Sequence, residues 1–318
     1  MKKILITGSD GLLGSQLCKD FLKIGMKVVG IDNQNKYGKI NLNFKKNKNF
    51  TFIKGDCADY KLMKRISLNC DYFIANAALV SGIKLMSLKP YDFYKKNEEI
   101  SQTAIHIALE LKKKNNKFKF IFISSSMVYE KNKKKYSSEI DSENISYPKN
   151  FYSFQKLSTE RKILSANQQE NLNYIIIRPF NIVGKGDEYL FKKSTHVIPD
   201  IIRKIDKNPK VINIYGNGNQ SRSFIHYEDV SQVILKSTIN NKIRKEIFNV
   251  GNEKQYSINE IINKILKIKK IYNLIVKKNK SFKIDVINNG ANIKKIKKVL
   301  NFKLKYNIDD IIKDYLLR

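Results

Sequence analysis

Tyr152 and Lys156 are four residues apart, a spacing that places both side chains on one face of a helix. A phenol, whose pKa is ordinarily about 10, is a weak base at neutral pH, but a neighbouring ammonium favours its ionised form. Such a tyrosine can take the proton of an alcohol or give it back. Ser124, Ser125 and Ser126 follow an apolar run and offer a hydroxyl that could share the same oxygen. A lone Tyr-Lys pair is common on surface helices. Other motifs are therefore needed to show whether this pair is catalytic.

Gly8, Gly11 and Gly14 form a Gly-x-x-Gly-x-x-Gly motif between a β-branched run and a helical pattern. Glycines in such a turn let the backbone approach a pyrophosphate, and the helix N-terminus supplies N–H donors and a positive dipole end. Asp32 ends the second apolar run, where a carboxylate can hold the ribose hydroxyls and repels a 2′-phosphate. Since Asn33 follows rather than a basic residue, the motif predicts NAD rather than NADP. With NAD as hydride acceptor, the proton transfer becomes the oxidation of an alcohol.

Short β-branched runs alternate with longer amphipathic stretches in the first half, which is typical of βαβ units and a parallel sheet. The predicted strands are residues 3–7, 27–31, 50–54, 71–75, 118–124 and 174–178. The predicted helices are residues 12–24, 59–67, 91–113 and 151–170. Several strands are apolar on both faces, as expected when helices cover both sides of a sheet. We therefore expect an α/β fold built on a Rossmann-type, doubly wound parallel sheet.

The sequence pattern changes after Pro179. The predicted strands and helices become shorter there, and glycines and prolines interrupt them. We expect residues 1–180 to form an NAD-binding domain that carries the catalytic residues. We expect residues 181–318 to form a smaller substrate-binding lobe, allowing that some of its strands and helices return to the first domain.

The chain of 318 residues contains 54 Lys and 7 Arg against 29 acidic residues, which gives a formal net charge of +32. A strongly basic chain raises nucleic acid or an anionic membrane as a partner. Specific nucleic-acid readers depend on Arg, however, and the lysines here are scattered over every segment. We interpret them as a solvated surface that attracts anionic substrates, so nucleic acid and membrane are not expected partners.

Cys18, Cys57 and Cys70 lie far apart without a C-x-x-C pair, so neither a disulfide framework nor a metal site is predicted. No apolar run reaches the roughly 18–20 residues of a membrane span, and the start of the chain lacks the apolar stretch of a signal peptide. These features predict a cytoplasmic protein.

Over nearly its whole length the chain resembles the extended short-chain dehydrogenase/reductase superfamily, in its nucleotide-sugar epimerase/dehydratase branch. Besides the glycine turn and the Tyr-Lys pair, the resemblance rests on the segments at 178–184 and 216–226, which read RPFNIVG and GNGNQSRSFIH. It implies that Ser125, Tyr152 and Lys156 are catalytic, with Ser126 as the alternative hydroxyl.

The resemblance also implies the binding residues. Cofactor-binding positions are Gly8, Asp10, Gly11, Leu12, Leu13, Gly14, Asp32, Asn33, Asp56, Cys57, Ala75, Ala77, Asn97, Ser124, Tyr152, Lys156 and Pro179. Within this set, Asp56 and Cys57 correspond to the pair that contacts adenine. Substrate-binding positions are Ser126, Asn181, His196, Val197 and Arg222. Asn181 and Arg222 correspond to contacts with the diphosphate of the substrate.

Departures from the family pattern narrow the chemistry. Ser126 and Met127 stand where sugar-dehydrating members carry an Asp-Glu pair, so 4,6-dehydration is not expected. His196 is either an acid/base residue, as in a reductase subfamily with a similar segment, or a hydrogen-bonding residue of the substrate lobe. Glu130 stands where the family often has glycine, and Asn292 where aspartate is common.

The resemblance and these departures imply chemistry at one carbinol carbon, C4 of a nucleotide-linked hexose. We expect an NAD-dependent nucleotide-sugar epimerase similar to UDP-glucose 4-epimerases. A 4-dehydrogenase or a GDP-sugar type 4-ketoreductase would use the same residues and stays open. A non-catalytic NAD sensor and a nucleic-acid-binding protein are remote alternatives. The helices predicted at 91–113 and 151–170 resemble those that pair family members, which implies a homodimer.

Overall fold

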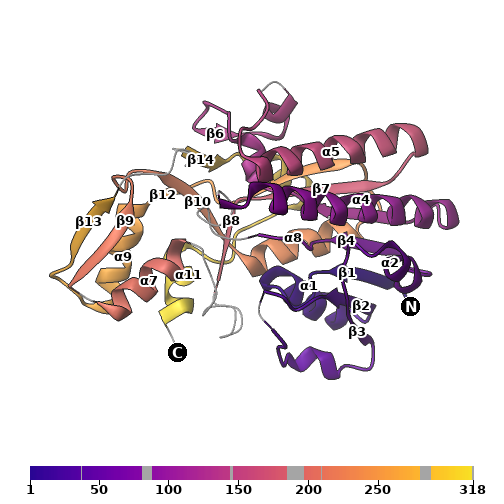
Figure 1. The fold of residues 1–318 in the computed structure, drawn as a ribbon, viewed down its shortest axis with the longest axis horizontal. Helices are drawn as coiled ribbons and strands as arrows, with labels where there is room; N and C mark the ends of the chain where they lie inside the picture. The colour runs from indigo at the N-terminus through magenta and orange to yellow at the C-terminus, as the bar shows by residue number, and fades with distance from the viewer. Residues whose placement is uncertain are drawn as a thin grey trace.

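The structure is a computed structural model that describes residues 1–36, 38–80, 88–143, 146–184, 197–208, 210–279 and 288–316. Its centre is a sheet of seven parallel strands (Figure 1). In spatial order the strands are β11 (Glu246–Val250), β7 (Tyr174–Pro179), β5 (Lys119–Ile123), β4 (Tyr72–Ala75), β1 (Lys3–Thr7), β2 (Lys27–Asp32) and β3 (Phe50–Lys54).

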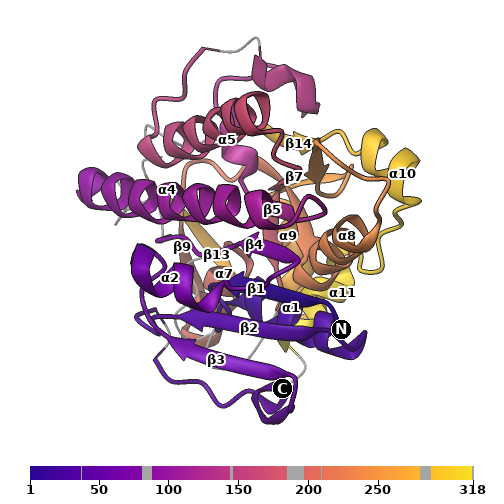
Figure 2. The same ribbon diagram turned by 90° about the vertical axis from the view of Figure 1, so that its right-hand side faces the viewer.

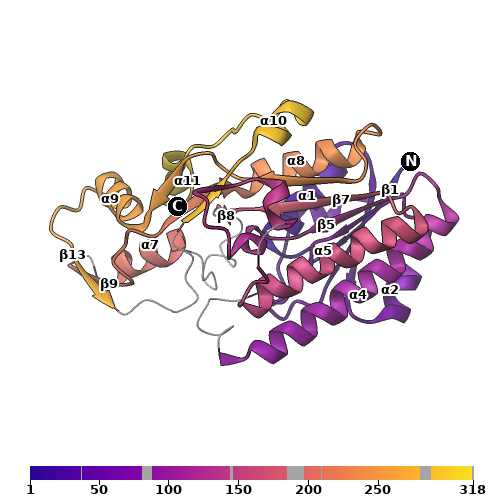
Figure 3. The same cartoon turned by 90° about the horizontal axis from the view of Figure 1, so that it is seen from above.

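Helices cover both faces of this sheet, because the side chains of each strand alternate between two apolar clusters. On β1, Leu5 packs in the cluster that includes residues of the first set of helices, α2 (Tyr60–Ile66), α4 (Pro90–Lys114) and α5 (Phe151–Glu170). Ile4 and Ile6 pack in the cluster that includes residues of the second set, α1 (Leu12–Lys23), α8 (Tyr227–Ile239) and α10 (Lys294–Leu300). Figures 2 and 3 show α4 and α5 running side by side on one face.

The six strands and four helices predicted in the first half all form, and each bound lies within one residue of the expected position. The expected α/β class and Rossmann-type parallel sheet are confirmed. The seventh strand, β11, comes from the second half of the chain and pairs with β7 in parallel. The helices α8 and α10, which also come from the second half of the chain, pack on one face of this central sheet.

The second lobe is built on two smaller sheets, at the opposite end of the molecule from α2 (Figure 1). One sheet contains β12 (Gln255–Ser257), β10 (Ser221–His226), β14 (Asn288–Ala291), β6 (Tyr136–Ser137) and β8 (Asn181–Val183). The other pairs β9 (Val211–Tyr215) with β13 (Ile275–Asn279). A separate apolar cluster joins these strands to α7 (Val197–Lys207), α9 (Ile258–Lys269) and α11 (Ile308–Leu316).

The described residues also form three short 3₁₀ helices: η1 (Asn43–Lys46), η2 (Ser126–Tyr129) and η3 (Glu139–Glu143). Two of them matter for the site, since η1 lies in the connection between β2 and β3, and η2 directly follows β5. Among the described residues, no helix is both long enough and apolar enough to cross a membrane.

Candidate active site

The glycine turn between β1 and α1 has the geometry that a pyrophosphate requires. Gly8 has a φ of +69°, a left-handed conformation that favours glycine. A Cβ atom on Gly14 would lie 1.9 Å from the carbonyl oxygen of Gly8, so α1 packs on the turn only with glycine there. The N-cap residue Gly11 has no side chain to cap the first N–H groups of the helix, which lack acceptors within it. The donors of Leu12 and Leu13 therefore fit the diphosphate of a dinucleotide.

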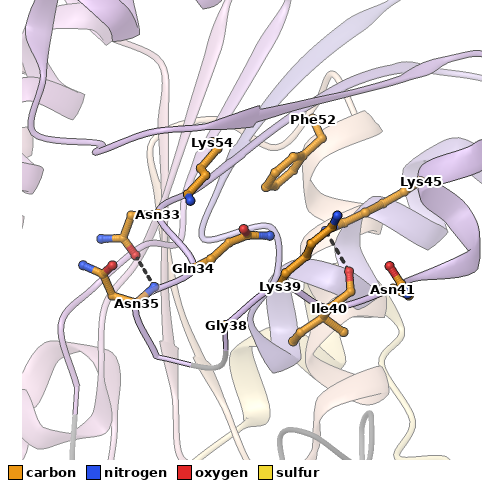
Figure 4. Close-up of a pocket in the computed structure, with 10 residues that line it drawn as sticks. All are labelled: Asn33, Gln34, Asn35, Gly38, Lys39, Ile40, Asn41, Lys45, Phe52 and Lys54. Carbon is orange, nitrogen blue, oxygen red and sulfur yellow. Dashed lines mark hydrogen bonds between the residues drawn. The ribbon is translucent and has the colours of Figure 1, made fainter.

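Asp32 ends β2 beside this turn. Its Oδ2 accepts the N–H of Asp10 (3.1 Å), and its Oδ1 accepts the N–H of Gln34 (2.7 Å). Burial raises the pKa of the Asp32 carboxyl, although these two donors oppose the rise. Each carboxylate oxygen can accept a further hydrogen bond, which suits a pair of ribose hydroxyls. The next residue, Asn33, is exposed and lines a cavity of about 600 Å³ near β3 and η1 (Figure 4).

Asp56 and Cys57 lie in the loop after β3, against the same turn. The N–H just before them donates to the carbonyl of Asp32 (3.1 Å). Asp56 accepts a hydrogen bond from Nζ of Lys96 (2.6 Å); burial raises the pKa of Asp56, but this bond and its partners lower it overall. Burial raises the pKa of the Cys57 thiol to about 12, so Cys57 is a packing residue and not a thiolate at neutral pH. The contact between Lys96 and Asp56 was not predicted from the sequence.

Asn97 in α4 holds the loop that follows β4. Its Oδ1 accepts the N–H of Leu79 (2.7 Å), and its Nδ2 donates to the carbonyl of Leu79 (2.9 Å). Ala75 ends β4, and Ala77 passes so close to the glycine turn that a Cβ on Gly8 would lie 3.1 Å from its Cα. In this structure the side chain of Asn97 thus positions the loop beside the turn.

Ser125, Tyr152 and Lys156 meet at the carboxyl edge of β5. Ser125 caps η2, where its Oγ accepts the N–H of Met127 (3.2 Å), and its side chain also hydrogen-bonds that of Tyr152. Nζ of Lys156 lies 5.8 Å from the centre of the Tyr152 ring and donates to the carbonyl of Ile123 (2.8 Å). The structure therefore brings the three predicted catalytic residues together.

The start of α5 explains how Tyr152 reaches this place. Asn150 is the N-cap, and its Oδ1 accepts the N–H of Tyr152 (2.8 Å), which puts Lys156 one turn further along the helix. The carboxylate of Glu130, at the end of η2, accepts the N–H of Asn150 (3.0 Å) and that of the residue before it (3.3 Å). Glu130 therefore ties the turn that carries Ser125 to the helix that carries Tyr152.

Burial shifts the pKa values of Tyr152 and Lys156, the predicted catalytic pair. It raises the pKa of Tyr152 to about 12, although the hydrogen bond with Ser125 opposes the rise. It lowers the pKa of Lys156 to about 8, against the opposing effect of the Glu160 carboxylate. The sequence predicts an ammonium that favours the phenolate, whereas in the structure burial is the largest influence on the pKa of Tyr152. Within the chain itself, Tyr152 is therefore a protonated phenol at neutral pH.

Arg178 and Glu160 form a buried ion pair near the predicted catalytic residues. Nε and Nη2 of Arg178 lie 3.0 Å and 2.6 Å from the two carboxylate oxygens of Glu160, and Nη1 donates to the hydroxyl of Tyr129 (2.6 Å). The hydroxyl of Ser124 also donates to Glu160. Pro179, which follows Arg178, ends β7. Ser124 is expected at the cofactor, but in this structure its hydroxyl is hydrogen-bonded to the Glu160 carboxylate of this ion pair.

The described residues expected at the substrate lie in η2, on the neighbouring strands β8 and β10, and at the start of α7. Ser126 is buried in η2. Asn181 on β8 donates from Nδ2 to a carbonyl of the neighbouring β10 (3.0 Å), and Arg222 on β10 donates to the carbonyl of its preceding residue (2.8 Å). Val197 begins α7, whereas His196 lies outside the described residues.

Comparison with known proteins adds an independent finding. Residues 4–251 match the NAD dependent epimerase/dehydratase family. A curated relative, the bifunctional polymyxin resistance protein ArnA of Wigglesworthia glossinidia brevipalpis, is 31% identical over 280 residues. The matched region covers 84% of this chain but 41% of ArnA, so the chain spans less than half the length of that relative.

Two solved structures are similar over 99% of this chain. The UDP-N-acetylglucosamine 4-epimerase from Methanobrevibacter ruminantium M1, in complex with UDP-N-acetylmuramic acid, is 28% identical, with a TM-score of 0.83 and 98% of its chain covered. The UDP-glucuronic acid 4-epimerase from Bacillus cereus, in complex with UDP-glucuronic acid and NAD, has a TM-score of 0.87 and 99% of its chain covered. At 24% identity, this second likeness concerns the fold alone. Because the family match spans most of the chain, including the glycine turn and the Ser-Tyr-Lys residues, the chain belongs to the NAD-dependent epimerase/dehydratase family of enzymes.

Proposed function

We propose that the chain is a nucleotide-sugar epimerase that inverts C4 of a hexose linked to a nucleoside diphosphate, with NAD as its cofactor. The observation that carries the proposal is the convergence of Ser125, Tyr152 and Lys156 on the sheet edge that also holds the glycine turn. The 28% identity to a UDP-N-acetylglucosamine 4-epimerase supports C4 as the reacting carbon and makes UDP-sugars the first substrates to test.

Tyr152 moves the proton in this proposal. In its phenolate form, Tyr152 takes the proton of the C4 hydroxyl and later returns it, while Ser125, hydrogen-bonded to Tyr152, donates to the same sugar oxygen. Lys156, fixed by the carbonyl of Ile123, places a positive charge beside the Tyr152 ring at neutral pH. Bound at the glycine turn, NAD would supply the hydride-accepting and hydride-donating ring for C4, and the positive charge of its oxidised form would favour the phenolate of Tyr152.

The surroundings of these residues favour chemistry at C4 over elimination of water. Dehydration needs an acid that protonates the leaving hydroxyl. Ser126 and Met127 cannot serve at the positions where dehydrating relatives carry acids. The carboxylate of Glu130 is committed to two backbone N–H groups at the start of α5, and that of Glu160 is paired with Arg178.

A single-turnover experiment tests the proposal. The chain is loaded with NAD and mixed with UDP-glucose, UDP-N-acetylglucosamine, UDP-glucuronic acid or a GDP-hexose, and products are separated by chromatography. We expect a C4 epimer to form without net NADH. Net accumulation of NADH would instead indicate a 4-dehydrogenase, the alternative that uses the same residues. Failure of every sugar nucleotide to react would contradict the proposal.

A further inference from the structure

The connection between β2 and β3 contains a lysine that reaches back to the glycine turn. Nζ of Lys45, in η1, lies 2.7 Å and 2.8 Å from the two carboxylate oxygens of Asp10. The same nitrogen donates to the carbonyl of Ile40 (3.2 Å) and lies 4.1 Å from the centre of the Phe52 ring (Figure 4). Asp10 is only 2% exposed, so this ion pair is largely shielded from solvent. The next lysine, Lys46, is exposed.

Asp10 belongs to the same hydrogen-bonded network as Asp32. The N–H of Asp10 donates to one oxygen of Asp32, and the N–H of Gln34 donates to the other. The side-chain amide of Gln34 in turn donates to Asp10 (2.8 Å). Burial raises the pKa of Asp32, the charge of Asp10 raises it further, and the charge of Lys45 opposes them. Two carboxylates therefore share one network, and Lys45 is a cation in direct contact with it.

This arrangement matters because the turn must accept an anionic diphosphate. Like charges repel strongly where solvent is excluded, so an uncompensated carboxylate at Asp10 would disfavour that ligand. Loss of the ion pair would also leave Asp10 and Gln34 less restrained, and these two residues supply the N–H donors that hold Asp32.

We propose that Lys45 is a positioning residue for NAD, which neutralises Asp10 and keeps the glycine turn and Asp32 in their binding geometry. The inference rests on the proposed use of NAD and adds a determinant outside the glycine motif. Since Lys45 acts through Asp10, its effect is expected on cofactor affinity rather than on the chemical step.

Affinity of the full chain for NADH provides the test. Titration is followed by the emission of the reduced nicotinamide, and no tryptophan emission interferes because the chain has no Trp. Lys45→Met is expected to weaken binding at least about tenfold. Lys45→Arg keeps the charge and should bind nearly as the parent does. Lys46→Met, the matched control, removes a charge from η1 at an exposed position and should leave the affinity unchanged.

A double variant separates charge compensation from a general structural role. Asp10→Asn combined with Lys45→Met removes both charges, and we expect its affinity to return to within about threefold of the parent. Parental affinity in Lys45→Met, or no recovery in the double variant, would overturn the inference.

Thermal unfolding of each variant shows whether it is folded before titration. If Lys45→Met does not fold, Lys45→Gln decides the question, because it keeps a donor without the charge and should show the same loss of affinity. Parental affinity in Lys45→Gln would then overturn the inference. If the parent chain itself did not bind NADH, the proposed function would fail together with the inference, whereas an unaffected lysine variant would overturn the inference alone.

Discussion

Tyr152 is the residue on which the proposed chemistry depends most directly. Replacing it by Phe removes the hydroxyl and leaves the ring beside Lys156. We expect the turnover of Tyr152→Phe to fall at least about 100-fold, the usual scale of acid/base catalysis. The content of bound nucleotide should not change, because the glycine turn and Asp32 are untouched. Product chromatography and the nucleotide released on denaturation measure the two quantities, and a turnover within about tenfold of the parent would contradict the role.

Individual site residues differ in how far the sequence could predict them. Tyr152 and Lys156 could be predicted as a pair because they are only one helical turn apart in the sequence. Contacts between distant segments were not, since neither residue type nor spacing marks them. Lys45 and Lys96 are two among 54 lysines, and only the folded chain shows that they contact Asp10 and Asp56. Glu130 did carry a signal, as a departure from the family pattern, but its contact with the start of α5 required the structure.

At the scale of elements, Glu130 joins η2, next to Ser125, to the start of α5, which carries Tyr152. Removing its carboxylate in Glu130→Ala leaves the N–H groups at the start of α5 without these acceptors. We expect kcat to fall about tenfold because Tyr152 and Ser125 lose their relative placement. The affinity for NADH should stay at the parental value.

Two further variants make this prediction specific. Glu130→Gln keeps one acceptor oxygen and should recover part of the lost kcat. Glu143→Ala removes an exposed carboxylate from the nearby η3 and serves as the control. A parental kcat for Glu130→Ala would show that the contact has no effect on catalysis.

Lys119 links β5 to the end of α8. It is 2% exposed, and its ammonium donates to three carbonyls at the end of that helix, those of Ser237 (3.1 Å), Thr238 (2.9 Å) and Asn240 (2.9 Å). Positive charge is favourable at a helix C-terminus, but burial disfavours it and lowers the pKa of Lys119 to about 8.

This lowered pKa predicts how stability depends on pH. Between the folded value near 8 and the ordinary value of 10.5, the folded chain has released the proton and the unfolded chain still holds it. The free energy of unfolding therefore rises with pH, by about 2 kcal/mol from about pH 7.5 to about pH 9.5 for this group. Urea denaturation should show this contribution in the parent and not in Lys119→Met. Equal pH dependence in the two proteins would refute the assignment.

The elements of the first half were predictable because each one is specified by its own residues. The run from Tyr174 to Pro179 is apolar enough to be a buried strand wherever it pairs, and Asn150 caps α5 locally. The second lobe was not predicted in detail, because its sheets join short strands from distant segments. For example, β6 pairs with β14, and nothing in the two residues of β6 specifies that partner.

At the scale of the whole molecule, exposed aromatic residues lie at the starts of α4 and α5. Tyr91 is 70% exposed, Tyr147 is 77% exposed and Phe151 is 56% exposed, and rings in this region contact one another in edge-to-face and stacked pairs. Large exposed aromatic surfaces of this kind are typical of interaction sites. We propose that a second copy of the chain covers them through its own α4 and α5.

Sedimentation velocity tests the proposed homodimer. The parent should sediment with twice the 37.0 kDa mass of one chain. Tyr91→Glu places a charge on the aromatic surface and should shift the protein toward the monomer. Tyr272→Glu makes the same change at a position in the second lobe that is 85% exposed and should remain dimeric. A monomeric parent would rule out the dimer.

The position of β11 in the central sheet has a consequence for biosynthesis. All six residues of β7 are buried, and its outer neighbour, β11, begins only at Glu246. The chain must therefore be synthesised as far as β11 before the open edge of β7 can be covered. Until then a nascent chain exposes an apolar strand edge that invites aggregation. A fragment that stops at residue 180 would keep that edge permanently, so it is not expected to persist in solution as a truncated protein.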